Sequence, residues 1–505
     1  MMTHRTPSDK EQPSTLMSAM STSTSPTRSN GETSHGVDAN VDVDESSDYG
    51  IELKPLVHGL DGESSTCATG VEMGLDGSGS GSACTSSPRR RSCNATSSAN
   101  GGITTGSHAS ATAAVGTASN AQVAVNIFIS FVGAGLLGQP FAFSKAGWLL
   151  GTIAVIAVSA ANVYAMLLLV QIRKYLEHQD QFLKGTIKGY GCIGRVVSGT
   201  TGENFVNICL VISQVGFATA YIIFIAANIT TVFPAIHRSY ICFGCVPILC
   251  ILVQVQDMKT LSPFSLIADV ANILGLSAVL FQDYEYYEYH HEVIHAATNF
   301  KGFIYVASVA IYSLEGVNLV LPLESSCADR KGFPKLLMQV ITGISILMVA
   351  FGSAGYIAFG SKTEAPVTLN LPPDGPWGNF VKVALSLALY LTYPVMMFPV
   401  GHVLEDQLQL FRQYSVTTRA LVVFLTSVVA WAIPSFGKFL GLVGSSICMI
   451  LGFILPCYFH LRVFDPNDLS KTELFMDYAL IVVGTIMGVI GTYNSFMDLL
   501  EGNDV

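Results

Sequence analysis

The sequence is poor in charged residues. Asp, Glu, Lys and Arg make up 12% of its 505 residues, where about 25% is usual for soluble globular domains. Half of the residues are hydrophobic, and the mean hydropathy is +0.48. The composition therefore excludes an ordinary water-soluble enzyme and indicates repeated membrane-spanning helices of about 20 apolar residues each, with the lipid bilayer as surroundings.

A large basic surface is missing as well. Residues 1–120 carry seven Lys and Arg against thirteen Asp and Glu, and the remainder carries 19 against 23. Binding to a nucleic acid backbone requires clustered Lys and Arg, so we expect no nucleic acid partner.

The motifs of common enzymes are also lacking: there is no P-loop, no HExxH and no nucleophile elbow. Cys242 and Cys245 form a single CxxC pair, with no second pair or His cluster that would complete four zinc ligands. We therefore expect neither an enzyme nor a metal or cofactor site.

The first 120 residues differ in character from the rest of the chain. They are rich in Ser, Thr and Gly and have no sustained apolar periodicity, which predicts a disordered tail over residues 1–120. Residues 1–10 lack the apolar core of a secretory signal, so we expect this tail to stay in the cytosol, where it could bind a partner.

Long apolar stretches follow from residue 121 and predict an all-α polytopic membrane protein. The membrane domain covers residues 121–497, and a short non-cytosolic tail covers residues 498–505. Eleven helices are expected near residues 121–144, 147–172, 205–231, 240–255, 262–281, 302–325, 334–359, 378–403, 417–434, 437–461 and 474–496. The fourth is short and the ninth and tenth nearly touch, so hydropathy alone leaves ten or twelve spans open.

The distribution of Lys and Arg supports this topology. With a cytosolic N-terminus, the cytosolic loops receive thirteen Lys and Arg and the opposite loops receive six. The acidic segment around Asp283, Glu285, Glu288 and Glu292 is expected to be a loop on the non-cytosolic side.

The first predicted span contains residues that a continuous helix avoids. In VGAGLLGQPF at 132–141, Gly133, Gly135 and Gly138 each weaken a helix by about 1 kcal/mol relative to Ala, and Pro140 removes a hydrogen-bond donor. The pattern predicts an interruption at membrane depth, although glycines can also serve close helix packing.

The sixth predicted span contains a carboxylate. In IYSLEGVNLVLPLE at 311–324, Glu315 and Gly316 fall midway along the apolar segment. An acid at bilayer depth is costly and usually faces a cavity or freed backbone, although Glu315 could also only brace the break. Interruptions in spans one and six indicate two inverted five-helix repeats whose freed peptide groups face each other near the midplane, a geometry that suits a zwitterion such as an amino acid.

Several segments, taken together, resemble the amino acid/auxin permease family. They are SFVGAGLLGQPFAFSKAGW at 130–148, SLEGVNLVLPLESS at 313–326, YIAFG at 356–360, VTLNLP at 367–372 and LTYPVMMFPV at 391–400. Among that family the sequence is most similar to the vacuolar and lysosomal proton-coupled transporters. The resemblance implies a LeuT-like fold of inverted five-helix repeats, with eleven transmembrane helices, broken helices 1 and 6, and substrate between them.

The resemblance also implies which residues hold the substrate. Backbone contacts are expected at Val132, Gly133, Ala134, Gly135, Leu136, Ser313, Leu314 and Glu315. Gln214 and Tyr221 on the third span, with Tyr312 on the sixth, are candidates for shaping the pocket, although each could instead make an interhelical hydrogen bond.

The coupling ion is less strongly indicated. Sodium sites in such a fold use hydroxyls on the eighth span, where Thr392 supplies one and Leu391 supplies none. Asp269 and Asn272 share a face of the fifth span, and a desolvated acid can load and release a proton. We therefore expect proton coupling through Asp269 and Glu315 rather than sodium coupling, although Asp269 could be purely structural.

These observations predict secondary active transport of neutral amino acids, with a proton as the co-transported ion, across a vacuolar or lysosomal membrane rather than the plasma membrane. The alternative is an amino acid sensor that signals through a partner bound to its N-terminal tail and transports little. A channel is disfavoured because the sequence has no recognisable filter motif.

Overall fold

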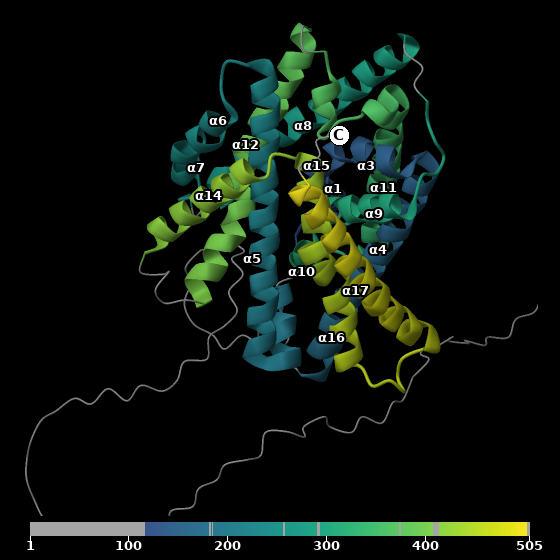
Figure 1. The fold of residues 1–505 in the computed structure, drawn as a ribbon. Helices are drawn as coiled ribbons and strands as arrows, with labels where there is room; N and C mark the ends of the chain where they lie inside the picture. The colour runs from purple at the N-terminus through teal and green to yellow at the C-terminus, as the bar shows by residue number, and fades with distance from the viewer. Residues whose placement is uncertain are drawn as a thin grey trace, which may run out of the picture. The chain divides into compact units, whose positions relative to one another are not determined.

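The structure is a computed structural model that describes residues 117–180, 183, 185–255, 258–289, 293–372, 375–407 and 414–501. All but the last four residues of the predicted N-terminal tail, and residues 502–505 of the predicted C-terminal tail, lie outside the described residues. All of the secondary-structure elements in the described residues are α-helices or short 3-10 and π turns, apart from one isolated β-bridge (Figure 1). This confirms the all-α prediction.

The first half of the membrane domain is built from eight helical elements. They are α1 (Asn120–Phe131), α2 (Ala134–Leu137), α3 (Gln139–Ala146), α4 (Trp148–Gln179), α5 (Tyr190–Val232), α6 (Arg238–Gly244), α7 (Val246–Leu252) and α8 (Met258–Tyr289). The long helix α5 turns at Ser198 and Gly199, where Gly199 has a positive φ of 66°. A residue without a side chain accepts this conformation readily.

The second half contains a further eight α-helices, together with short 3-10 and π turns. The α-helices are α9 (Phe300–Ser313), α10 (Val317–Ser326), α11 (Phe333–Phe359), α12 (Pro376–Gln407), α14 (Ser415–Ala432), α15 (Phe436–Val443), α16 (Leu455–Val463) and α17 (Lys471–Leu500). The 3-10 turns η2 (Gly360–Lys362) and η3 (Val367–Asn370) lie between α11 and α12. The π turns η4 (Gly444–Cys448) and η5 (Ile450–Ile454) join α15 to α16.

Nine helical segments within the described residues are long and apolar enough to cross a membrane. Two shorter apolar segments, Asn120–Phe131 and Arg238–Leu252, coincide with the first and fourth predicted spans. The fourth is divided into α6 and α7 at Cys245. The chain is thus a multi-pass membrane protein with about nine candidate spans.

The prediction of an acidic loop at residues 283–292 is wrong for residues 283–289, because α8 continues to Tyr289. Asp283 is only 2% exposed, and its Oδ2 lies 3.5 Å from the point where a Cβ on Gly355 of α11 would sit. The missing side chain of Gly355 leaves room for the carboxyl group. The helix thus continues, packed against α11, through residues whose polarity alone suggested a loop.

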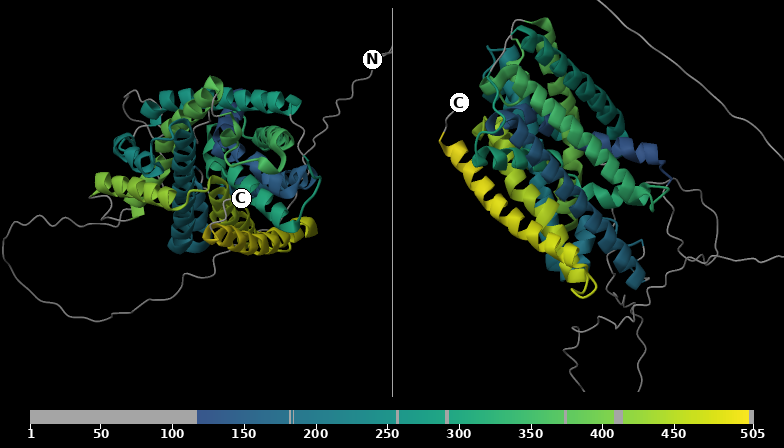
Figure 2. Two further views of the ribbon diagram at one scale, coloured as in Figure 1. Left: turned by 45° about the horizontal axis from the view of Figure 1, so that its top comes forward. Right: turned by 90° about the vertical axis from the view of Figure 1, so that its right-hand side faces the viewer.

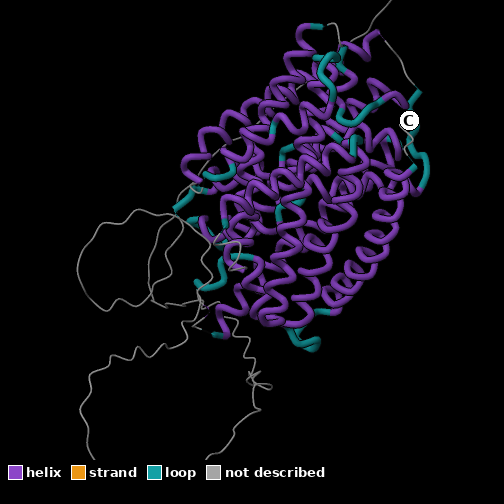
Figure 3. The backbone as a smooth tube through the Cα atoms, turned by 60° about the vertical axis from the view of Figure 1, so that its left-hand side comes forward, coloured by secondary structure: helices purple, strands orange, loops and turns teal. Residues whose placement is uncertain are grey.

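Burial separates interior helices from lipid-facing ones. The segment α9–α10 and the segment α15–α16 each have 78% of their apolar stretch buried, whereas α17 has 17%. Figure 2 shows α17 running along one side of the bundle, and Figure 3 shows that helices make up most of the described chain. The exposed apolar side chains of α17 are suited to contact with lipid.

The start of the described chain is attached to the end of α10. Ala118 forms an isolated parallel β-bridge with Cys327: the Ala118 amide donates to the Ser326 carbonyl, and the Ala328 amide donates to the Ala118 carbonyl, both at 3.0 Å. Ser119 then caps α1 in a reciprocal arrangement with Gln122. The segment preceding α1 is thereby fixed beside the C-terminal end of α10.

Candidate functional site

The first helical interruption lies between α1 and α2. Val132 has φ −88° and ψ 95°, and Gly133 is extended with φ −144° and ψ −154°. The helix restarts at Ala134, and Leu136 donates to the Gly133 carbonyl at 3.1 Å. The Val132 amide still donates to the Phe128 carbonyl at 3.0 Å, but both residues between α1 and α2 have non-helical dihedral angles, in a segment that is mostly buried.

The second interruption lies between α9 and α10. Leu314 has φ −99° and ψ 14°, Gly316 has φ −170° and ψ 15°, and the helix restarts at Val317. The carbonyl oxygen of buried Leu314 accepts a hydrogen bond of 2.6 Å from Nδ2 of Asn162 on α4. A neighbouring helix therefore satisfies a peptide group that the interruption releases.

The two interruptions meet at small residues. A Cβ on Gly135 would lie 2.9 Å from Cα of Ser313, closer than real Cβ contacts allow. Nε2 of Gln139, on the following helix, donates to Oγ of Ser313 at 3.2 Å. On the other side, a Cβ on Gly316 would collide with the ring of Phe131. The residues expected to contact substrate through their backbones therefore lie side by side, although they are far apart in sequence.

Glu315 lies within the second interruption, next to the π turns. Its Oε2 is 3.6 Å from the point where a Cβ on Gly452 of η5 would sit. Its Oε1 is buried and accepts no hydrogen bond from any residue that the structure describes. Beside it, the Tyr190 hydroxyl donates at 3.0 Å to the carbonyl of Leu451, also in η5. The carboxyl group thus borders irregular backbone on both sides, and π turns of this kind frequently mark functional sites.

The third predicted span brings an aromatic surface to the same place. Tyr221 is 6% exposed, and its hydroxyl lies 3.9 Å from the point where a Cβ on Gly133 would sit. The ring of Tyr312 packs edge-on against Phe217 of α5, with ring centroids 4.7 Å apart. The Tyr312 hydroxyl is buried without a hydrogen-bond partner among the described residues. Gln214 is also buried and lies two helical turns before Tyr221.

Two contributors to this region, Asn162 and Phe217, were missed by sequence reasoning. Phe217 follows Gln214 by three residues and precedes Tyr221 by four, so a search of that helical face would have found it. Asn162 is one polar residue in an apolar helix, and nothing in its sequence neighbourhood identifies Leu314 as its partner.

The ion-coupling candidates lie on two other helices. Asp269 on α8 is partly buried and within electrostatic range of the Tyr221 hydroxyl, and its neighbour Asn272 is 8% exposed. The Thr392 hydroxyl on α12 donates at 2.9 Å to the Ala388 carbonyl of the same helix. The Thr392 proton is therefore occupied within its own helix, whereas Asp269 lies near a residue of the candidate pocket.

A buried ion pair closes one end of α10. Arg173 of α4 pairs with Glu324, and both side chains are at most 2% exposed. Arg173 also donates to the Leu321 carbonyl at 3.1 Å and to the Ser325 hydroxyl at 2.7 Å. This pair, which sequence reasoning did not single out, fixes α10 to α4 on the same side as the attachment of Ala118.

The fold and the interrupted segments define a multi-pass membrane protein whose interior contains irregular, buried backbone beside a carboxyl group. The family model described as transmembrane amino acid transporter protein matches residues 116–497. The chain belongs to this family.

The curated relatives have corresponding names. Amino acid transporter AVT3A of Arabidopsis thaliana is 36% identical over 386 residues, which cover 74% of this chain and 88% of the relative. Vacuolar amino acid transporter 3 of Schizosaccharomyces pombe is 28% identical over 409 residues, covering 75% of this chain and 58% of the relative. Among solved structures, MhsT in complex with L-phenylalanine matches with 12% identity and a TM-score of 0.44, covering 74% of this chain and 97% of that chain.

Proposed function

We propose that this protein is a secondary active transporter that moves neutral amino acids together with protons across a vacuolar membrane. The observation that carries the proposal is the contact between the two interruptions at Gly135 and Ser313, with the Glu315 carboxyl group beside them. Membership of the amino acid transporter family and the vacuolar names of relatives support the substrate class and the membrane.

In the proposed site, the peptide groups bind both charged ends of an amino acid. The amides that follow Gly133 carry partial positive charge and bind the carboxylate, while carbonyls at the end of α9 and the Glu315 carboxyl group bind the ammonium group. The rings of Tyr221, Tyr312 and Phe217 bound the space for the substrate side chain.

The proposed topology counts α1–α3 as the first span and α6–α7 as the fourth, which gives eleven spans with interruptions in spans one and six. Spans one to five and six to ten then form inverted repeats, and the N-terminus is cytosolic. The sensor alternative has no observation in its favour among the described residues, since the tail on which it depends lies outside them.

Proton coupling is proposed through Glu315 and Asp269. The Glu315 carboxyl group borders the substrate-binding backbone, and Asp269 is within electrostatic range of Tyr221. Protonation of either group changes the charge of the site by one unit and thereby couples proton binding to substrate binding.

Uptake of labelled amino acids into proteoliposomes tests the proposal. The purified full-length protein should accumulate neutral amino acids when a pH gradient is imposed, with or without sodium. A strict sodium requirement without dependence on the pH gradient would contradict the coupling, and absence of uptake across a panel of neutral, acidic and basic amino acids would contradict the function.

A further inference from the structure

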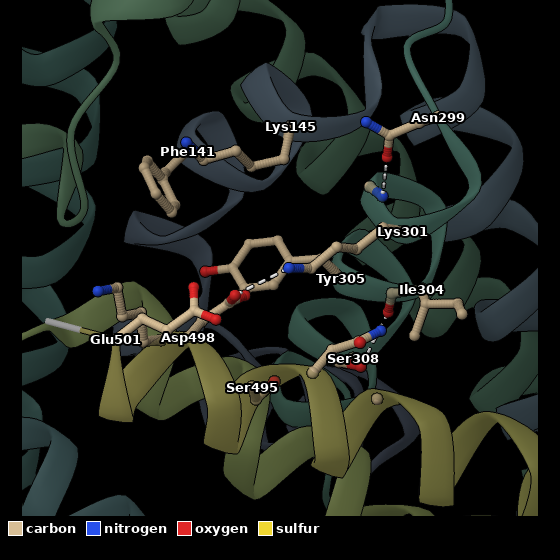
Figure 4. A pocket seen from close by; sticks show the side chains of 14 residues that line it. Phe141, Lys145, Asn299, Lys301, Ile304, Tyr305, Ser308, Ser495, Asp498 and Glu501 are labelled. Carbon is tan, nitrogen blue, oxygen red and sulfur yellow. Dashed lines mark hydrogen bonds and ion pairs between the residues drawn. The ribbon is translucent and has the colours of Figure 1, made fainter. Parts of the chain in front are cut away.

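A cavity of about 310 Å³ lies away from the two interruptions, between α3, α9, α15 and α17 (Figure 4). It occupies the end of the bundle where α3 and α17 end and α9 begins, opposite the end closed by Arg173. The lining includes neither Gln214 and Tyr221 of α5 nor the interrupted residues 132–136 and 313–315. Its volume is at the lower end of the range for small-molecule sites.

The cavity wall carries charges of both signs. Lys145 of α3 and Lys438 of α15 contribute ammonium groups, and Asp498 and Glu501 at the end of α17 contribute carboxylates. In Figure 4 the ring of Tyr305 lies between Lys145 and these carboxylates. The ammonium group of Lys145 and the carboxylates of Asp498 and Glu501 thus come from different helices, α3 and α17.

Lys145 is only partly compensated by its surroundings. Its ammonium group is half-buried and lies 4.6 Å from the ring centroid of Phe141. Burial lowers the pKa of Lys145, Asp498 raises it, and Lys438 lowers it again. Asp498 also forms an ion pair with Lys301 at 2.8 Å. Lys145 and Lys301 therefore share the negative charge of one carboxylate. A further anionic group would stabilise the protonated form.

Tyr305 offers a hydrogen bond in the same space. Its hydroxyl is buried and has no hydrogen-bond partner in the part of the chain that the structure describes. The ring is held by an edge-on contact with Phe141 at 5.9 Å between centroids and by the absence of side chains at Gly437 and Gly441 of α15. A buried hydroxyl without a partner is costly, and a ligand atom in the cavity would supply one.

We propose that this cavity is a second binding site for a free amino acid, with the ligand carboxylate at Lys145 and Lys438 and its ammonium group at Asp498 and Glu501. The choice of ligand class rests on the proposed function. An inorganic anion would use only the lysines, whereas a zwitterion uses both the lysines and the carboxylates. In the proposed topology the site faces the non-cytosolic side.

The position of the site links its occupancy to the interrupted helices. The helix α9 ends at the second interruption, and α3 follows the short helix α2 that begins after the first. Ser308, in the cavity wall, is five residues before Ser313. A ligand that contacts α3, α9, α15 and α17 together stabilises the conformation in which these four helices are close.

Binding stoichiometry tests the proposal. Full-length protein in lipid nanodiscs is titrated by equilibrium dialysis with labelled neutral, acidic and basic amino acids. The wild type should bind two molecules per chain. Lys438→Gln on α15 and Glu501→Gln at the end of α17 should each weaken one of the two sites about tenfold and leave the other unchanged. Lys335→Gln, which alters an exposed lysine outside the cavity, should keep both sites.

The possible contrary results are distinct. One site per chain, or two sites that neither cavity variant affects, would overturn the proposal. The second amino acid site could also be lost when phosphatidylethanolamine replaces phosphatidylglycerol in the nanodisc. That result would mean that the lipid headgroup competes for the cavity and would identify a lipid, not a free amino acid, as its occupant. If either variant fails to fold, Tyr305→Phe, which removes only a hydroxyl, takes its place and should weaken the same site.

Parallel uptake measurements separate this inference from the proposed function. Uptake in proteoliposomes with only one binding site means that the second site is absent while the transport function stands. Binding that is sensitive to Lys438→Gln, without any uptake, means that the cavity site stands while the transport function fails. No binding of any amino acid in the panel overturns both.

Discussion

Asn162 on α4 donates a hydrogen bond of 2.6 Å to the carbonyl oxygen of Leu314, the residue at which α9 loses helical geometry. Both residues are buried. The interruption is therefore stabilised by a fixed partner on another helix, and this hydrogen bond sets the direction in which the Leu314 peptide group points. The amide of the next residue, Glu315, donates to the Tyr312 carbonyl at 3.4 Å.

Replacing Asn162 with Leu should remove this partner and leave the Leu314 carbonyl unsatisfied. A buried polar group without a partner costs about 1–3 kcal/mol, so the variant should have a lower melting temperature and reduced uptake. Ser159→Ala on the same helix is the matched control, because the Ser159 hydroxyl donates only to the Val155 carbonyl within α4. Equal melting temperatures for the two variants would contradict the assigned role of Asn162.

The interruptions were predictable from local chemistry, but their contacts were not. Gly133, Gly135 and Pro140 destabilise a helix whatever surrounds them, so their effect can be predicted from the sequence alone. The approach of Gly135 to Ser313 depends on how two distant segments cross, which no local pattern encodes. For the same reason Asn162 could not be matched with Leu314 in advance.

Tertiary packing also explains the expectations that differ from the structure. The apolar run at 437–461 predicts one helix, but it contains two π turns whose freed Leu451 carbonyl is bonded by Tyr190. The acidic composition after residue 282 suggested a loop, but α8 continues to Tyr289, and Gly355 of α11 leaves room for the Asp283 carboxyl group. In both cases a residue on another helix lies beside the segment that differs from the expectation, which the sequence pattern does not show.

Gly135→Ala should impair transport strongly. The added methyl group would lie within 2.9 Å of Cα of Ser313, so α2 and α9 must separate at the proposed substrate site. Overpacking of this kind typically costs about 1–3 kcal/mol, and uptake should fall at least about tenfold. Gly343→Ala in α11, where nothing lies within 4 Å of the added Cβ, should leave uptake unchanged. Normal uptake by Gly135→Ala would show that the interrupted segments need not touch.

Glu315→Gln should abolish uptake that is driven by a pH gradient while leaving expression and folding intact. Gln has nearly the same shape but cannot gain or lose a proton, and Glu315 already lacks a hydrogen-bond partner at Oε1 among the described residues. Relative to the wild type, the variant should retain more of its amino acid binding than of its amino acid accumulation. Glu364→Gln, an exposed acid between α11 and α12, is the control. Accumulation at the wild-type rate would remove Glu315 from the coupling mechanism.

Glu324→Gln should destabilise the protein by about 3–5 kcal/mol, because it leaves Arg173 as a buried charge without its partner. The double variant Arg173→Met with Glu324→Leu should recover much of that loss, since neither charge then remains. Thermal unfolding of the single and double variants measures the coupling. In contrast, Arg195→Gln disrupts a pair whose Arg is 42% exposed and should cost no more than about 1 kcal/mol. A single variant as stable as the wild type would show that the Arg173 charge is compensated by another group.

Amino acid binding in the cavity should weaken as the pH rises. Burial and Lys438 lower the pKa of Lys145, while a bound carboxylate favours the protonated form and raises that pKa again. Binding therefore takes up a proton whenever the pH exceeds the lowered pKa of free Lys145, so the affinity is constant below that pH and decreases above it. The other charged groups that face the cavity are Lys301, Lys438, Asp498 and Glu501.

Lys145→Gln isolates the contribution of Lys145 to this pH dependence. The variant should bind more weakly at neutral pH and show a flatter profile, because the remaining slope comes only from the other cavity groups and from titration of the ligand itself. Dissociation constants measured for both proteins from pH 6 to pH 10 with one neutral amino acid provide the comparison. Parallel profiles would mean that Lys145 does not contact the ligand carboxylate, and stronger binding at high pH would reverse the assigned sign.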